Sequence, residues 1–167
     1  AEAAYDRSDD CSFTSFVGYE YTSTPVSENM HRNVVFRNAN VPAAPVTYMD
    51  ANTPERLWTA LDERCRREEG CETLTIPHNS NLSGGLIFQS ATAATEETPG
   101  PMEMDEARRR SRWEPLVEIM QHKGSSECDS RLPVWQGDEL CGFEKLPYDR
   151  FGSKQSSFVE ARQAPAS

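Results

Sequence analysis

The order of strand-like and helical segments constrains the fold of this chain more than any other feature of its sequence. Runs typical of strands, each bounded by turn residues, occupy residues 13–22, 32–37, 73–76 and 116–121. Helical patterns separate the second run from the third, and the third from the fourth. Strands that alternate with helices are typical of α/β folds with a parallel sheet, where ligands bind at the C-terminal ends of strands. We therefore expect a parallel α/β fold.

The two predicted helices differ in character. Thr53 can cap the first helix, Pro54 suits its first position, and Gly70 is expected to end it. Its apolar face consists of Leu57, Trp58, Leu61 and Cys65. The second helix covers about residues 104–113 and carries Arg108, Arg109, Arg110 and Arg112. These arginines can bind phosphate, but the neighbouring acidic residues favour a solvated helix face with balanced charge.

Length and charge limit the possible functions. A chain of 167 residues suffices for one domain with a real core. The net charge of −10 argues against nucleic acids and anionic membranes as partners, because both require a basic surface. No apolar run approaches the roughly 20 residues of a membrane span, and no signal-peptide pattern is present. We expect a small-molecule substrate, while the compartment, periplasmic or cytoplasmic, and the oligomeric state stay open.

The cysteine pattern leaves two interpretations. The five cysteines cannot all pair, and none lies in a C-x-x-C arrangement that would indicate a structural zinc site. Cys65 and Cys71 flank the end of the first helix, so they can be bridged in an oxidising compartment. Buried free thiols are the alternative, and we favour them.

Candidate metal ligands adjoin three of the strand-like runs. Glu20 lies near the end of the first run, His31 precedes the second, and His78 directly follows the third. Carboxylates and imidazoles are common ligands of catalytic divalent ions. We therefore predict that these three side chains converge on one point. The alternatives are a solvent-facing charge for Glu20 and a backbone-bonded turn histidine for His31, while His122 is interpreted as a surface or packing residue.

Four segments together resemble a known family. They read FTSFVGYEYTS, HRNVVFR, IPHNSNLS and RWEPLVEIMQHKGSSE. In this order they are similar to the middle portion of a large bacterial family of unknown function, which itself resembles the polymerase-and-histidinol-phosphatase (PHP) metallohydrolases. The similarity runs from near residue 1 to about residue 145. Gly18-Tyr19-Glu20 matches the G-x-E strand end of PHP proteins. A PHP histidine after the next strand-like turn matches His31, and one beside a proline after the following strand matches His78.

The resemblance implies a fold, a cofactor and an activity. The implied fold is a distorted (β/α)7 barrel with two or three divalent ions, zinc, manganese or iron, and the implied reaction is phosphoester hydrolysis. Such ions lower the pKa of coordinated water to about 7 and neutralise charge on the transferred group. Asn79 and Asn81 are expected to contact substrate or to orient His78, and Lys123 and Glu127 to contact substrate or transfer protons.

Three motifs of the PHP pattern are missing from this sequence. The opening H-x-H strand, the T-D-H segment and the closing D-x-H segment do not occur. The chain thus matches about three of eight or nine expected ligands. We interpret residues 1–152 as a partial barrel domain, incomplete at both ends and expected to be inactive alone, and residues 153–167 as an unpacked or disordered tail. The alternative is a non-catalytic binding or interaction domain with incidental histidines.

Overall fold

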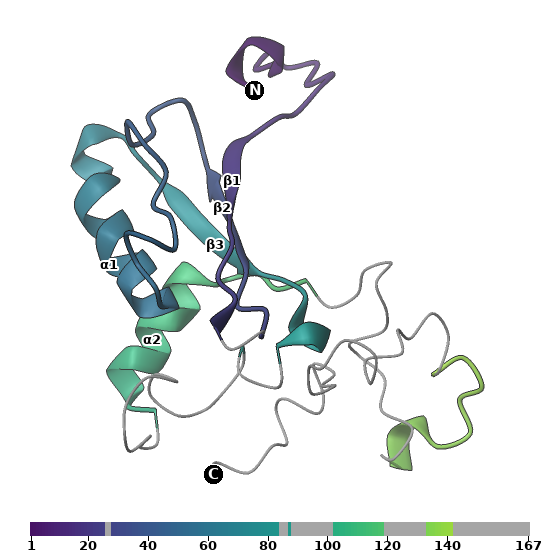
Figure 1. Ribbon diagram of the computed structural model, residues 1–167. Helices are drawn as coiled ribbons and strands as arrows, with labels where there is room; N and C mark the ends of the chain where they lie inside the picture. The colour runs from purple at the N-terminus through teal and green to yellow at the C-terminus, as the bar shows by residue number, and fades with distance from the viewer. Residues whose placement is uncertain (26–27, 84–86, 88–101, 119–132, 142–167) are drawn as a thin grey trace.

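A computed structural model describes residues 1–25, 28–83, 87, 102–118 and 133–141. Its centre is a three-stranded sheet in the order β1-β2-β3 (Figure 1). The strands are β1 (Val17–Tyr21), β2 (Arg32–Phe36) and β3 (Thr73–Pro77). Both neighbouring pairs are antiparallel, with Tyr19 opposite Val34 and Val34 opposite Thr75. The fold is therefore mixed α/β with an open antiparallel sheet.

The prediction of a parallel sheet is wrong, and the path of the chain between β2 and β3 explains why. The residues after β2 form a long connection that runs back along the sheet before the helix begins. Asn38 at its start donates to Gly70 O (3.2 Å), and Ala51 near its end accepts from the Tyr21 hydroxyl at the opposite end of the sheet (2.6 Å). Because this connection has already returned the chain to the end of the sheet where β2 starts, α1 runs in the direction of β2, and β3 then runs antiparallel to β2. Among the described residues no barrel is formed.

Both predicted helices are confirmed, as α1 (Pro54–Arg64) and α2 (Met104–Trp113). The Thr53 side chain caps α1 by accepting from Arg56 N (3.3 Å). Short 3-10 turns are Glu2–Ala4, Arg67–Glu69, Ser80–Leu82 and Pro133–Trp135. Gly70 ends the turn at Arg67–Glu69 rather than α1, in the left-handed conformation (φ 77°). No described helix is long and apolar enough to cross a membrane.

The predicted strand at residues 116–121 is not found in its described part. Residues 116–118 have no strand assignment, and residues 119–121 lie outside the described ranges. Glu118 N nevertheless donates to Pro77 O at 3.1 Å, beside the end of β3.

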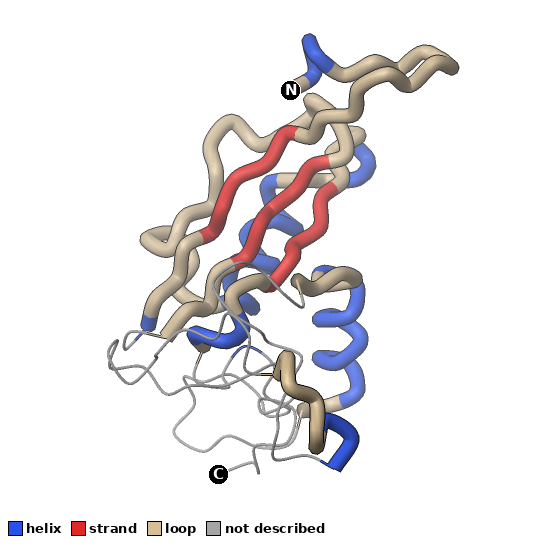
Figure 2. Tube along the Cα trace, turned by 90° about the vertical axis from the view of Figure 1, so that its right-hand side faces the viewer, coloured by secondary structure: helices blue, strands red, loops and turns tan. Residues whose placement is uncertain are grey.

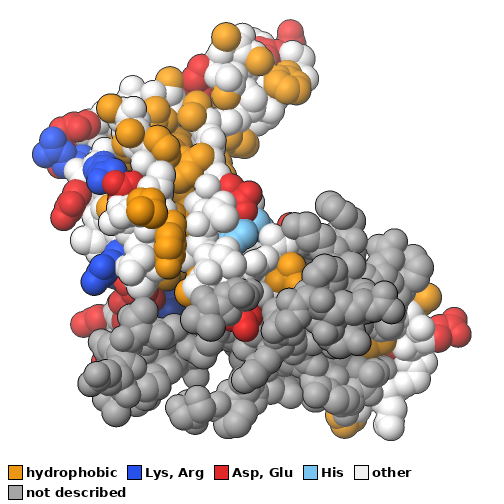
Figure 3. Space-filling view, viewed as in Figure 1, with side chains coloured by type: hydrophobic (Ala, Val, Ile, Leu, Met, Phe, Trp, Pro, Cys, Tyr) orange, Lys and Arg blue, Asp and Glu red, His pale blue; other side chains and the backbone are white. Residues whose placement is uncertain are grey.

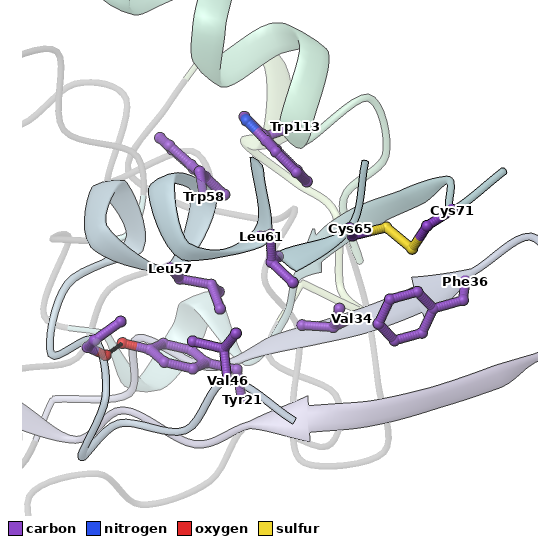
Figure 4. Close-up of a cluster of buried hydrophobic side chains, with 11 residues drawn as sticks. Tyr21, Val34, Phe36, Val46, Leu57, Trp58, Leu61, Cys65, Cys71 and Trp113 are labelled. Atoms are coloured by element: carbon purple, nitrogen blue, oxygen red, sulfur yellow. Dashed lines mark hydrogen bonds between the residues drawn. A yellow bond between two sulfur atoms is a disulfide. The ribbon is translucent and has the colours of Figure 1, made fainter. Parts of the chain in front are cut away.

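The core lies between one face of the sheet and the helices (Figures 2 and 4). Tyr21, Val34 and Phe36 point from the strands toward α1, whose Leu57, Trp58 and Leu61 are fully buried. Trp58 Nε1 donates to Thr75 Oγ1 (3.2 Å), which joins the helix to the centre of β3. Each such buried apolar side chain contributes about 1.5–3 kcal/mol by leaving water. Burial also raises the pKa of Tyr21 to about 12, so its hydroxyl keeps the proton it donates.

Two further expectations can be compared with the structure. Cys65 and Cys71 form a disulfide with Cα atoms 5.0 Å apart, so the preference for free thiols was wrong for this pair. Cys141 is also disulfide-bonded, whereas Cys11 is free and exposed. The arginines of α2 pair largely with acids: Arg108 with Asp105, Arg109 with Asp62 and Arg110 with Glu55. The Arg108 pair fits the predicted solvated, charge-balanced face, whereas Arg109 and Arg110 are partly buried and pair with acids of α1 rather than with neighbours on α2.

Candidate metal centre

The register of the sheet brings the three predicted ligands to one end and one face. Core-facing positions include Tyr21 and Arg32, so the alternate position Glu20 faces away from the core. His31 and His78 extend the β2–β3 ladder by one pair, since His78 N donates to His31 O (3.3 Å). β1 and β3 run in the same direction on either side of β2. Their C-terminal ends and the start of β2 therefore lie at the same end of the sheet. The three side chains meet at that end, on the face of the sheet opposite the one that packs against α1.

The donor atoms converge as the sequence predicted. His31 Nδ1 lies 2.9 Å from Glu20 Oε1, and His78 Nε2 lies 3.6 Å from the same oxygen. One donor atom from each residue lies within 4.8 Å of the other two. A tetrahedral ion with ligands about 2.1 Å away separates them by about 3.4 Å, so small side-chain movements suffice to enclose one. The group can hold a metal ion.

The site is partly open to solvent. The Glu20 side chain is 47% exposed, whereas those of His31 and His78 are 14% and 10% exposed. The two rings meet edge to face with centroids 5.8 Å apart. Figure 3 shows histidine atoms reaching the surface beside an acidic side chain. A small molecule can therefore approach from the side of the Glu20 carboxylate, whereas the two imidazole rings are largely buried in the protein.

Polar neighbours hold the second nitrogen of each ring. Thr24 Oγ1 lies 3.0 Å from His31 Nε2, and the Asn79 side-chain nitrogen Nδ2 lies 2.8 Å from His78 Nδ1. In this orientation the Asn79 amide donates to Nδ1. Turned by 180°, the amide places its oxygen there and accepts from Nδ1–H, and this second arrangement leaves the Nε2 lone pair for a ligand. Carboxylates and carbonyls commonly orient ligand histidines in this way. Asn79 thus contacts the His78 ring, and its role in orienting that ring stays a prediction.

Sequence reasoning missed two residues that support the site. Thr24 contacts His31, and the Glu118 carboxylate accepts from Asn79 N at 3.2 Å. Asn79 adopts a left-handed conformation (φ 57°), which asparagine tolerates better than most residues. The sequence signal for Thr24 was its place in the loop between two strand-like runs. Glu118 gave no signal, because its contact depends on packing beside β3.

Other predicted site residues cannot be placed. Asn81 belongs to the turn Ser80–Leu82, but its side chain is outside the described part of the structure. Lys123 and Glu127 lie in residues 119–132, which are also outside it. Their roles stay predictions. The same holds for the boundary at residue 152 and the tail at 153–167.

Comparison with protein families identifies the family of this chain. The sequence matches the family described as "Protein of unknown function (DUF3604)" over residues 1–165. The chain belongs to this DUF3604 family. No curated protein and no solved structure matches it. The predicted membership of a family of unknown function is therefore confirmed, over a longer stretch than the four segments indicated, whereas the PHP resemblance of this DUF3604 protein stays a prediction.

Proposed function

We propose that Glu20, His31 and His78 bind a divalent cation, zinc, manganese or iron, in a metal-dependent hydrolase that acts on phosphoesters. The observation that carries the proposal is the convergence of one carboxylate oxygen and two imidazole nitrogens within 4.8 Å. These donors are the types that zinc and related ions prefer. Glu20 and His31 come from the connected strands β1 and β2, whereas His78 follows β3 and joins them only through the pairing of β2 with β3.

Each residue has a distinct part in this proposal. Glu20 supplies a negative charge that lowers the net charge of the bound ion, and its exposed side leaves room for substrate. His31 and His78 supply neutral lone pairs from largely buried rings, which limits their movement. A bound cation would polarise a phosphoryl oxygen and neutralise charge that develops on the transferred group. Asn79 would keep the His78 ring in its binding orientation.

Phosphoester hydrolysis rests on the resemblance to PHP metallohydrolases. That resemblance also implies the distorted (β/α)7 barrel, the second or third ion, and contributions from Asn81, Lys123 and Glu127. Three donors satisfy only part of a tetrahedral or larger coordination sphere, so substrate or further donors must complete it. We accordingly expect the chain to bind metal and phosphate better than it turns substrate over.

The experiment is a calorimetric titration of inorganic phosphate into the zinc-loaded chain, with p-nitrophenyl phosphate turnover measured in parallel. We expect phosphate to bind the loaded wild type, and to lose binding in the Glu20→Ala variant and in the zinc-free protein. His122→Ala serves as the matched control, because it removes a histidine that the proposed site does not use. If the loaded chain ignores both phosphate and the ester, the hydrolase assignment fails and a binding domain becomes the better description.

A further inference from the structure

We infer that His31 binds the cation through Nδ1 and that Thr24 is the positioning residue that makes this possible. The inference rests on the proposed metal centre and concerns a residue outside its ligand set. Two contacts define the ring. Nδ1 faces Glu20 Oε1 at 2.9 Å, and Nε2 faces Thr24 Oγ1 at 3.0 Å. The nitrogen that faces the shared carboxylate is the one directed at the ion.

A hydroxyl at position 24 can serve both states of the site. An ionised carboxylate only accepts, so without an ion the ring places a proton on Nδ1 and Nε2 accepts from the Thr24 hydroxyl. With an ion, Nδ1 must offer its lone pair, and a neutral ring then carries its proton on Nε2 and donates to the same hydroxyl oxygen. A hydroxyl rotates to suit either arrangement, whereas an apolar group offers neither a donor nor an acceptor.

The loop that carries Thr24 is fixed at its base. Met30 N donates to Ser23 O (2.8 Å), and Asn29 N donates to Leu82 O (3.0 Å). The buried Arg32 guanidinium donates to Met30 O at 2.6 Å. Thr24 itself is exposed and faces His31 across this closed loop. The hydroxyl is thus held at a set position by backbone contacts rather than by its own burial, so its substitution leaves the core unchanged.

The test compares Thr24→Val with Thr24→Ser. Valine keeps the β-branched shape and removes the hydroxyl, whereas serine keeps the hydroxyl. Loss of a partner that orients a metal-binding histidine weakens metal affinity by about 10- to 100-fold. We expect that loss for zinc in the valine variant, near-wild-type affinity in the serine variant, and unchanged thermal unfolding of both metal-free proteins. Equal zinc affinity in wild type and the valine variant would overturn the inference.

Long-range proton–nitrogen NMR of the histidine rings gives a readout that a purely structural role would not change. In zinc-loaded wild type we expect the His31 proton on Nε2, and in the valine variant at the same zinc concentration a larger share of the metal-free pattern, because zinc binds more weakly. In metal-free protein we expect the proton on Nδ1, and a changed chemical shift of Nε2 in the valine variant, because this nitrogen loses the hydrogen bond from the Thr24 hydroxyl. If wild type binds no zinc, the proposed function fails, while these metal-free spectra still decide the role of Thr24. A metal-free His31 spectrum unaffected by valine would reject that role.

Discussion

Arg32 and Glu114 form a buried ion pair at the start of the central strand β2, next to His31. Loss of this pair should therefore lower the free energy of unfolding substantially. The Arg32 and Glu114 side chains are 1% and 6% exposed, and Arg32 Nε donates to Glu114 Oε1 at 2.8 Å. Glu114→Leu leaves the guanidinium buried, with its remaining contact to Met30 O. Removing one partner of a buried pair typically costs about 3–5 kcal/mol, because the other charge stays uncompensated.

That cost has a measurable size. For a domain of this length, 1 kcal/mol shifts the melting temperature by roughly 2–4 °C, so Glu114→Leu should lower it by roughly 6–20 °C. The double variant Arg32→Met with Glu114→Leu removes both charges and should recover a large part of the loss. Recovery should be incomplete, because Met30 O then lacks its donor, at a cost of about 1–3 kcal/mol.

The assays are thermal unfolding, which gives the melting temperature, and urea unfolding, which gives the free energy of unfolding, both monitored by circular dichroism and with a surface pair as the control. Arg37 and Glu72 are 72% and 40% exposed and lie 3.0 Å apart. Glu72→Leu should change the free energy of unfolding by less than about 1 kcal/mol. The reasoning would be refuted if Glu114→Leu were as mild as this control, or if the double variant were as unstable as the sum of its two single variants.

Three further predictions concern the disulfide, a loop carboxylate and the support of His78. The Cys65–Cys71 bridge joins residues six positions apart, so Cys65→Ala with Cys71→Ala should reduce stability by about 2 kcal/mol; a loss below 0.5 kcal/mol in denaturant titrations would contradict the expected loop-closure effect. The backbone and hydroxyl of Thr47 hold the pKa of Asp50 below its ordinary value, so this contribution is present at neutral pH and is lost as pH falls through the lowered pKa. Asp50→Asn should therefore make the acid side of the stability–pH curve shallower, and an identical curve would exclude the role. Asn79→Gly keeps the left-handed backbone but removes the amide that contacts His78, so zinc affinity should fall by about 10- to 100-fold, whereas Asn79→Asp should retain more of it because it keeps an acceptor. Equal affinities of these two variants in calorimetry would count against the proposed contact.

Local signals in the sequence predicted the helices well. Thr53 and Pro54 mark the start of α1, and its apolar spacing defines the face that packs on the sheet. The boundaries of α2 also agree with the prediction. These features depend on residues close together in the chain, which is why the sequence reveals them.

The sheet direction and the supporting contacts depend on distant residues. The pass of residues 38–50 along the sheet is set by contacts such as Tyr21 with Ala51, which no local pattern contains. The contact of Thr24 with His31 and that of Glu118 with Asn79 N likewise join residues that no local pattern brings together. The convergence of Glu20, His31 and His78 was predicted from their places beside strand-like runs, although the expected parallel sheet would put the start of β2 at the other end. Antiparallel pairing instead brings the start of β2 to the ends of β1 and β3.

The most direct test of the metal centre is a calorimetric titration of Zn²⁺ into the metal-free chain and its single alanine variants at positions 20, 31, 78 and 122. We predict one zinc per chain in wild type and in His122→Ala, and at least tenfold weaker binding in Glu20→Ala, His31→Ala and His78→Ala. Absence of binding in wild type, or binding that survives all three ligand substitutions unchanged, would contradict the account.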